Sequence, residues 1–240
     1  SATDFNPDPN ETIRIALPKL KNGTQEERVR TFGFVYQQLM FAYNKGNFPT
    51  DANKRALSVE LIRLYEIVDE GMKRSVLQAL TRYGENAISK PFIFKVLDGS
   101  DVQRREAVLS VLGVPGGVSG PDIYEKVKDL ANRGLIKPEA RTTMLARVDK
   151  DRALTEVLDV IKSTTDMEHF IYSAWALQDY YKEPANYKFI VPRLRELELV
   201  SDGKVMKKFF RGGNPLGWMD ADLFSRYIET APFAQSLQAF

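Results

Sequence analysis

The sequence predicts an all-α fold in which antiparallel helix pairs stack along the chain as an α-solenoid. Three observations support this fold class. Apolar residues recur at helical spacing through most of the 240 residues, and capping residues, glycines and prolines interrupt that pattern at short intervals. Short amphipathic helices are not stable alone, so each must bury its apolar stripe against its neighbours. With 43% hydrophobic residues, the chain has enough apolar surface for a substantial core.

The clearest helix pair lies between Asn86 and Gly113. We expect regular helix in its first half from about Pro91, where a missing N–H is tolerated in a first turn. The Asp-Gly-Ser-Asp turn at 98–101 should end this helix, with Gly99 free to take a left-handed conformation.

The second helix of this pair is expected over about 102–112, capped by Asp101 at its start. Val102 should face inward, whereas Arg104 and Arg105 belong to a run of polar residues that should face solvent. Gly113 and Pro115 then end the helix.

This pair resembles a HEAT repeat. The resemblance rests on the proline in the first helix, the acidic D-G-S-D turn, the paired arginines that open the second helix and the A-V-L-x-x-L-G ending; Met72–Gly84 resembles the second helix of a preceding repeat. The resemblance implies a right-handed superhelix of stacked helix pairs, which binds other macromolecules and has no catalysis of its own.

Residues 1–113 are therefore predicted to form N-terminal helical repeats. Asn10, Thr24 and Asp51 are placed to cap helices, and Thr24 forms a capping-box pattern with Glu27. The helices are expected at about 11–20, 25–43, 52–68 and 72–83.

Residues 114–120 are predicted to be a hinge or long loop, because the stretch from Gly113 to Pro121 holds four glycines and two prolines. The order of glycines that cradles a phosphate, with a strand before it, is missing.

Residues 121–200 are predicted to form C-terminal helical repeats, with helices at about 121–132, 138–148, 151–163, 165–181 and 186–199. An aromatic stripe on the helix at 165–181 indicates core packing. An alternative interpretation assigns 123–136 and 195–205 to winged-helix elements, but acidic residues balance the basic ones there.

Residues 201–240 depart from the repeat pattern and are expected to cap the open end of the core. Their basic and aromatic residues could instead contact a partner. These residues are Lys207, Lys208, Phe209, Phe210, Arg211 and Trp218.

Composition excludes several kinds of chemistry. The chain has no cysteine, which excludes disulfides and thiolate sites, and its one histidine, His169, makes histidine-based metal or triad chemistry a poor fit. We therefore predict no cofactor, no metal site and no catalytic residue. The absence of cysteine and the start at Ser1 favour an exported protein, periplasmic or extracellular. No apolar run is long enough to span a membrane.

The resulting hypothesis is a non-enzymatic scaffold or adaptor that binds another protein, with Arg104, Arg105 and Trp218 as contacts. One alternative is a nucleic-acid-binding protein that uses residues 207–211, although a net charge of +2 provides little electrostatic attraction. Another is a glycan hydrolase with paired carboxylates, such as Glu66 and Glu70. The sequence contains no signal for an oligomeric state.

Overall fold

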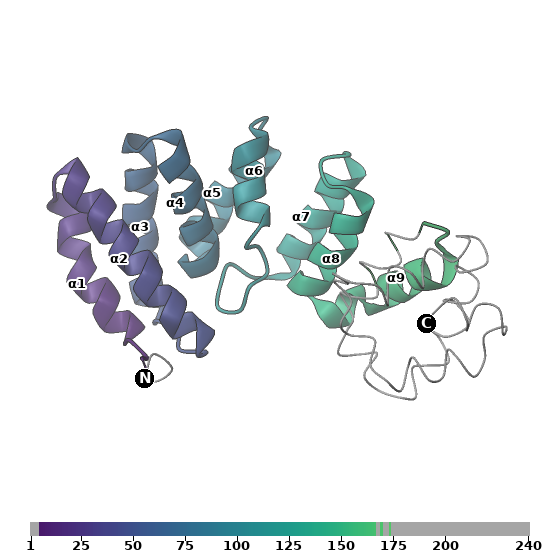
Figure 1. The fold of residues 1–240 in the computed structure, drawn as a ribbon, viewed down its shortest axis with the longest axis horizontal. Helices are drawn as coiled ribbons and strands as arrows, with labels where there is room; N and C mark the ends of the chain where they lie inside the picture. Colours follow the sequence, from purple (N-terminus) through teal and green to yellow (C-terminus); the bar gives the residue numbers. More distant parts are fainter. Residues whose placement is uncertain (1–4, 167–168, 170–172, 174–240) are drawn as a thin grey trace, which may run out of the picture. The chain divides into compact units, whose positions relative to one another are not determined.

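The computed structural model describes residues 5–166, 169 and 173, and in this part the chain is all-helical, with nine α-helices and no strand (Figure 1). For the described residues, the all-α prediction is confirmed. The chain divides into two compact units, residues 1–123 and residues 124–240, which are described separately below.

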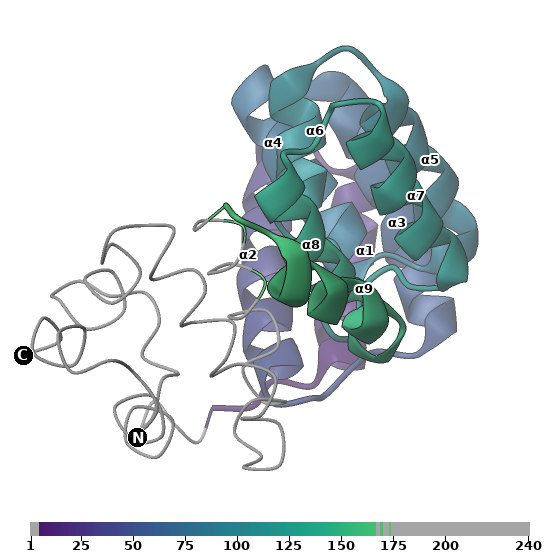
Figure 2. The same cartoon turned by 90° about the vertical axis from the view of Figure 1, so that its right-hand side faces the viewer.

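Unit 1 holds the first six helices: α1 Pro9–Asn22, α2 Gln25–Asn44, α3 Asp51–Ile67, α4 Glu70–Tyr83, α5 Asn86–Asp98 and α6 Val102–Leu109. Their contacts follow chain order. Helix α1 packs on α2 and α3, α3 packs on α4 and α5, and α6 packs on α4 and α5. Figure 2 shows the result as two layers, with α1, α3 and α5 on one side of the unit and α2, α4 and α6 on the other.

Side-chain caps begin the helices of unit 1. Thr24 and Asp101 cap α2 and α6, as predicted, by accepting backbone N–H groups. The other two predicted caps, Asn10 and Asp51, were wrong. Asp8 caps α1 and Thr50 caps α3. Asn10 instead joins the two helices, because its Oδ1 accepts from Thr50 N at 2.9 Å and from Asn53 Nδ2 at 2.8 Å.

The core of unit 1 consists mainly of leucines from both layers. Its largest fully buried side chains include Leu39, Leu57, Leu61, Leu64, Leu77, Leu80 and Ile93. An aromatic cluster extends this core, because Tyr83 of α4 meets Tyr36 and Tyr43 of α2 edge-on, at 5.5 and 4.8 Å between ring centroids. Burial of each such side chain stabilises the fold by roughly 1.5–3 kcal/mol.

The turn between α5 and α6 differs from its prediction in three respects. Helix α5 begins at Asn86 rather than near Pro91, because the Glu85 carboxylate caps the Ile88 N–H and starts the helix earlier. Gly99 has φ −74° and is not left-handed. Val102 is the first residue of α6 and is 59% exposed, rather than buried.

Arg105 explains the unexpected conformation of Gly99. Its Nε donates to Leu97 O at 3.1 Å, and its Nη2 donates to Gly99 O at 2.5 Å. The guanidinium therefore satisfies carbonyls at the end of α5 that a left-handed glycine would otherwise help to satisfy. The prediction that Arg105 faces solvent was wrong, since only 5% of the residue is exposed.

The glycine-rich residues 114–120 form a loop that is anchored to the helices of unit 1. Val118 is buried, and its N–H donates to Thr81 O at 2.9 Å. Lys54 Nζ donates to Gly116 O at 3.0 Å, and Ser119 N donates to Asn86 Oδ1 at 2.9 Å.

Helix α7, Pro121–Asn132, contains the boundary between the units, and α8, Pro138–Val148, and α9, Lys150–Ser163, follow in unit 2. Helices α8 and α9 pack together, and an ion pair between Arg141 and Glu156 joins them. The elements predicted after residue 166 lie outside the described residues, apart from His169 and Ser173. Among the described helices, none is both long and apolar enough to cross a membrane.

Candidate partner-binding surface

Two of the eight predicted contact residues, Arg104 and Arg105, belong to the described part of the chain. The other six, Lys207, Lys208, Phe209, Phe210, Arg211 and Trp218, lie outside it. Arg105 is buried and bonded to backbone carbonyls, so little of its side chain is exposed on this surface. Arg104 is the remaining predicted contact.

Arg104 lies in the first turn of α6, where three side chains hold it. Its Nε donates to Glu70 Oε2 at 3.2 Å, its Nη2 donates to the other oxygen of the same carboxylate, and Asp101 Oδ2 lies 3.5 Å from Nε. The guanidinium also lies 5.7 Å from the centroid of the Tyr65 ring. The hydrogen bonds that Arg104 donates to the Glu70 carboxylate raise the pKa of Arg104 above its ordinary value. This fork geometry fixes the direction of a side chain that is still 31% exposed.

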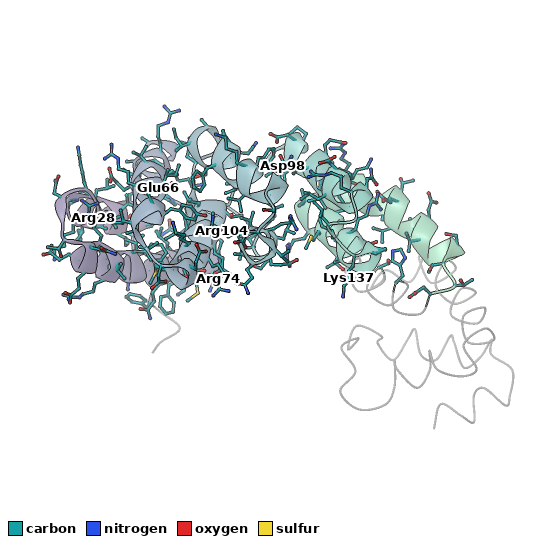
Figure 3. All side chains as sticks on the ribbon, turned by 90° about the horizontal axis from the view of Figure 1, so that it is seen from above. Arg28, Glu66, Arg74, Asp98, Arg104 and Lys137 are labelled. Carbon is teal, nitrogen blue, oxygen red and sulfur yellow. The ribbon has the colours of Figure 1, made fainter. Side chains whose placement is uncertain are left out.

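A row of polar bonds continues from Arg104 along the junction of α4 and α6. Helix α4 contributes Glu70, Arg74 and Gln78, spaced four residues apart on one face. Arg74 Nη1 donates to Gln103 Oε1 at 3.0 Å, and Gln78 Nε2 donates to Ser110 Oγ at 3.3 Å. Figure 3 shows Arg74 and Arg104 close together over these two helices.

The charge on Arg74 is less compensated than that on Arg104. The partner of Arg74 is the neutral amide of Gln103, and no carboxylate among the described residues pairs with this arginine. An arginine bonded only to an amide keeps most of its attraction for an anionic group.

A hollow of about 320 Å³ lies beside Arg104 at the end of α5. It is lined by Phe92, Lys95, Val96, Gly99, Ser100, Asp101 and Arg104. Phe92 packs edge-on against Tyr65, with centroids 5.1 Å apart, so the apolar side of the hollow is fixed by α3. We call this hollow, together with Glu70, Arg74 and Gln103, the Arg104 surface.

A larger hollow of about 570 Å³, the α1–α3 groove, was not predicted. It is lined by Arg14, Leu17, Pro18, Lys21, Asn22, Asn53, Ala56, Val59 and Glu60. One feature of the sequence could have indicated this groove. Glu60 lies on the same face of α3 as Leu57, Leu61 and Leu64, so a carboxylate interrupts a stripe of buried leucines.

The chemistry of the other candidate residues is limited. Glu70, one of the two carboxylates considered for glycan hydrolysis, is bonded to Arg104. His169 Nε2 lies 3.1 Å from Thr142 Oγ1, and Asp166 accepts the His169 backbone N–H rather than an imidazole proton. Across the described ranges, no group of three or more histidine or carboxylate side chains is arranged to hold a metal ion.

No protein-family model, curated protein or solved structure shows significant similarity to this chain. Its function must therefore be inferred from the residues of the Arg104 surface and from the packing of the helices around it.

Proposed function

We propose that the chain is a non-enzymatic scaffold, built from HEAT-like helical repeats, that binds another protein through the Arg104 surface. The observation that carries this proposal is the combination, on one exposed junction, of two oriented arginines and an adjacent hollow with apolar walls. Protein interfaces typically combine apolar pockets with a polar rim in which arginine is enriched.

The packing of unit 1 supports the repeat architecture. Helices of one layer contact in series, α1 with α3 and α3 with α5, while α4 and α6 contact in the other layer. In a stack of this kind each pair depends on its neighbours, and the second helices of successive pairs present a continuous surface. The two arginines of the Arg104 surface come from two such second helices, α4 and α6, and its hollow is lined by the end of α5 and the turn that follows.

The chemistry of the surface specifies the partner's side of the contact. Arg74 and the exposed edge of Arg104 would pair with acidic side chains, and Lys95 on the rim of the hollow adds a third cation. Phe92 and Val96 would accept an apolar side chain. A partner with an acidic and apolar segment fits this pattern better than nucleic acid does, because Phe92 and Val96 give the hollow apolar walls that phosphate groups would not fill.

Affinity capture from a lysate of the source organism tests this proposal. The full chain and an Arg74→Ala/Arg104→Ala variant would be compared at low and moderate salt, with bound protein and nucleic acid both measured. We expect a protein that the wild type retains at moderate salt and the double variant loses.

Arg30→Ala is the matched control, since Arg30 is also an exposed helix arginine paired with a glutamate, but on α2. Equal capture by all three chains would contradict the proposal. Recovery only of nucleic acid that washes off with salt would favour the alternative based on residues 207–211.

A further inference from the structure

The α1–α3 groove is lined by a buried carboxylate, Glu60, of which only one oxygen accepts a hydrogen bond. Glu60 is 6% exposed, and its Oε1 accepts a hydrogen bond from Arg63 Nη1 at 3.0 Å. Its Oε2 is buried and has no hydrogen-bond partner among the described residues. A charged oxygen that is shielded from water and left without a donor is costly, and such atoms are rare in folded proteins.

A donor that enters the groove could remove this cost. The groove is lined by Glu60 itself, and the terminal torsion of a glutamate is broad, so a small rotation can turn Oε2 toward a bound group. Arg63 already occupies the other oxygen, and a carboxylate can accept from separate donors at its two oxygens. The best donor for a buried carboxylate is itself charged, such as an ammonium group.

The rim of the groove carries positively charged side chains, opposite in sign to the Glu60 carboxylate. Arg14 is already paired with Glu11 three residues earlier on α1. Lys21 is exposed, and no residue in the described part of the chain pairs with its ammonium group. Lys21 is therefore available to bind an anion at the rim while Glu60 binds a cation inside the groove.

We propose that the α1–α3 groove binds a small zwitterion with an apolar side chain, namely an amino acid or the first residue of a short peptide. The ligand's ammonium group donates to Glu60 Oε2, its carboxylate pairs with Lys21, and its side chain packs on Leu17, Pro18 and Val59. A volume of about 570 Å³ is within the range of roughly 300–1,000 Å³ that is usual for small-molecule sites. This site shares no residue with the Arg104 surface and does not depend on the function proposed above.

Calorimetric titration of the full chain with four probes tests both ends of the ligand. The probes are L-leucine, N-acetyl-leucine, which lacks the ammonium group, leucinamide, which lacks the carboxylate, and the tripeptide Leu-Gly-Gly. We expect leucine or Leu-Gly-Gly to bind, and N-acetyl-leucine and leucinamide to bind more weakly than leucine. Preference for leucine identifies a free amino acid as the ligand, and preference for Leu-Gly-Gly identifies a peptide. Absence of heat with all four probes, or N-acetyl-leucine binding as tightly as leucine, overturns the proposal.

Variants assign the binding to the groove. Glu60→Gln keeps the shape of the side chain and should weaken binding by at least about tenfold, since a charged hydrogen bond is lost. Ala56→Leu fills the groove, leaves Glu60 in place and should also abolish binding. Arg30→Gln and the Arg74→Ala/Arg104→Ala variant should bind as the wild type does. Binding that survives both groove substitutions refutes this assignment.

Discussion

At the scale of single residues, the adjacent arginines 104 and 105 have different surroundings although they share a helix turn. Arg105 is buried and donates to two carbonyls at the end of α5, whereas Arg104 is partly exposed and paired with Glu70. A buried carbonyl that loses a charged donor is left unsatisfied, but an exposed carboxylate that loses its partner is hydrated by water.

Replacement of these two arginines by methionine should therefore have unequal effects on stability. We expect Arg105→Met to reduce the free energy of unfolding by about 2–4 kcal/mol, because two carbonyls lose charged hydrogen bonds. Arg104→Met should reduce it by less than about 1 kcal/mol. Chemical denaturation followed by circular dichroism measures both values, and equal losses would contradict the structural role assigned to Arg105.

Two buried tyrosines form a second contrast. Tyr83 OH donates to Tyr36 O at 3.2 Å, whereas the Tyr43 hydroxyl is buried without a partner among the described residues. Tyr83→Phe should cost about 1 kcal/mol, the usual value of one hydrogen bond. Tyr43→Phe should be neutral or stabilising, because it removes an unsatisfied polar atom. Thermal denaturation of the two variants measures both changes in stability. A larger loss of stability for Tyr43→Phe than for Tyr83→Phe would contradict the prediction.

The same tyrosines predict instability in alkali. Burial raises the pKa of Tyr43 and of Tyr83 above the ordinary value of 10.0, so their stabilising contribution is complete below pH 10 and is lost as the pH rises above it. Burial lowers the pKa of Lys54 below its ordinary value of 10.5. Below pH 10.5 the unfolded chain therefore binds more protons at Lys54 than the folded chain does, and this difference makes stability rise with pH until about pH 10.5.

Above pH 10.5 the tyrosines should therefore dominate, and stability should fall. The fall should be shallower in Tyr43→Phe than in the wild type, because one of the two groups is absent. Denaturation midpoints between pH 10.5 and 12 provide the comparison. Parallel curves for the two proteins would show that Tyr43 ionises as easily in the folded chain as in the unfolded one.

At the scale of helices, two glycines show how position determines the effect of one methyl group. Gly33 is exposed inside α2, and a Cβ built on it meets no atom within 4 Å. Gly84 follows α4, and a Cβ there would overlap the Ser89 hydroxyl and the Leu80 carbonyl.

Gly33→Ala should stabilise the chain by about 0.5–1 kcal/mol, since alanine loses less backbone entropy in a helix. Gly84→Ala should destabilise it by about 1–3 kcal/mol through overpacking between α4 and α5. Thermal melting of both variants tests this pair, and a gain in stability for Gly84→Ala would show that the α4–α5 turn can open without cost.

Helix positions could be predicted from the sequence because they depend on local spacing and breaks. The start of α2 at Gln25 and the end of α4 at Tyr83 follow directly from such signals. Caps were less predictable, since Asp8 and Asn10 are both good capping residues and only packing against α3 distinguishes them.

The candidate sites depend more on packing between helices. Arg104 was predicted as a contact, but its bonds to Glu70 and its place beside Tyr65 require α3, α4 and α6 to meet. The burial of Arg105 depends on the path of the turn at 98–101, which sequence spacing does not specify. Glu60 was detectable as a charge within an apolar stripe, but the groove around it exists only because α1 packs on α3.

At the scale of the whole molecule, unit 1 contains both proposed binding sites on a scaffold whose helices contact in series. The side chains of each site come from several helices, so each site depends on the stacking of consecutive pairs. This dependence is the physical link between the proposed repeat architecture and the proposed binding function.

Site-specific photo-crosslinking tests the binding function most directly. A benzoylphenylalanine introduced at Gln103 lies on the Arg104 surface, and one introduced at Arg30 lies on the exposed face of α2. After irradiation in lysate of the source organism, the scaffold function predicts a discrete covalent adduct with one protein from position 103 and none from position 30. The same adduct from both positions, or none from position 103, would contradict it.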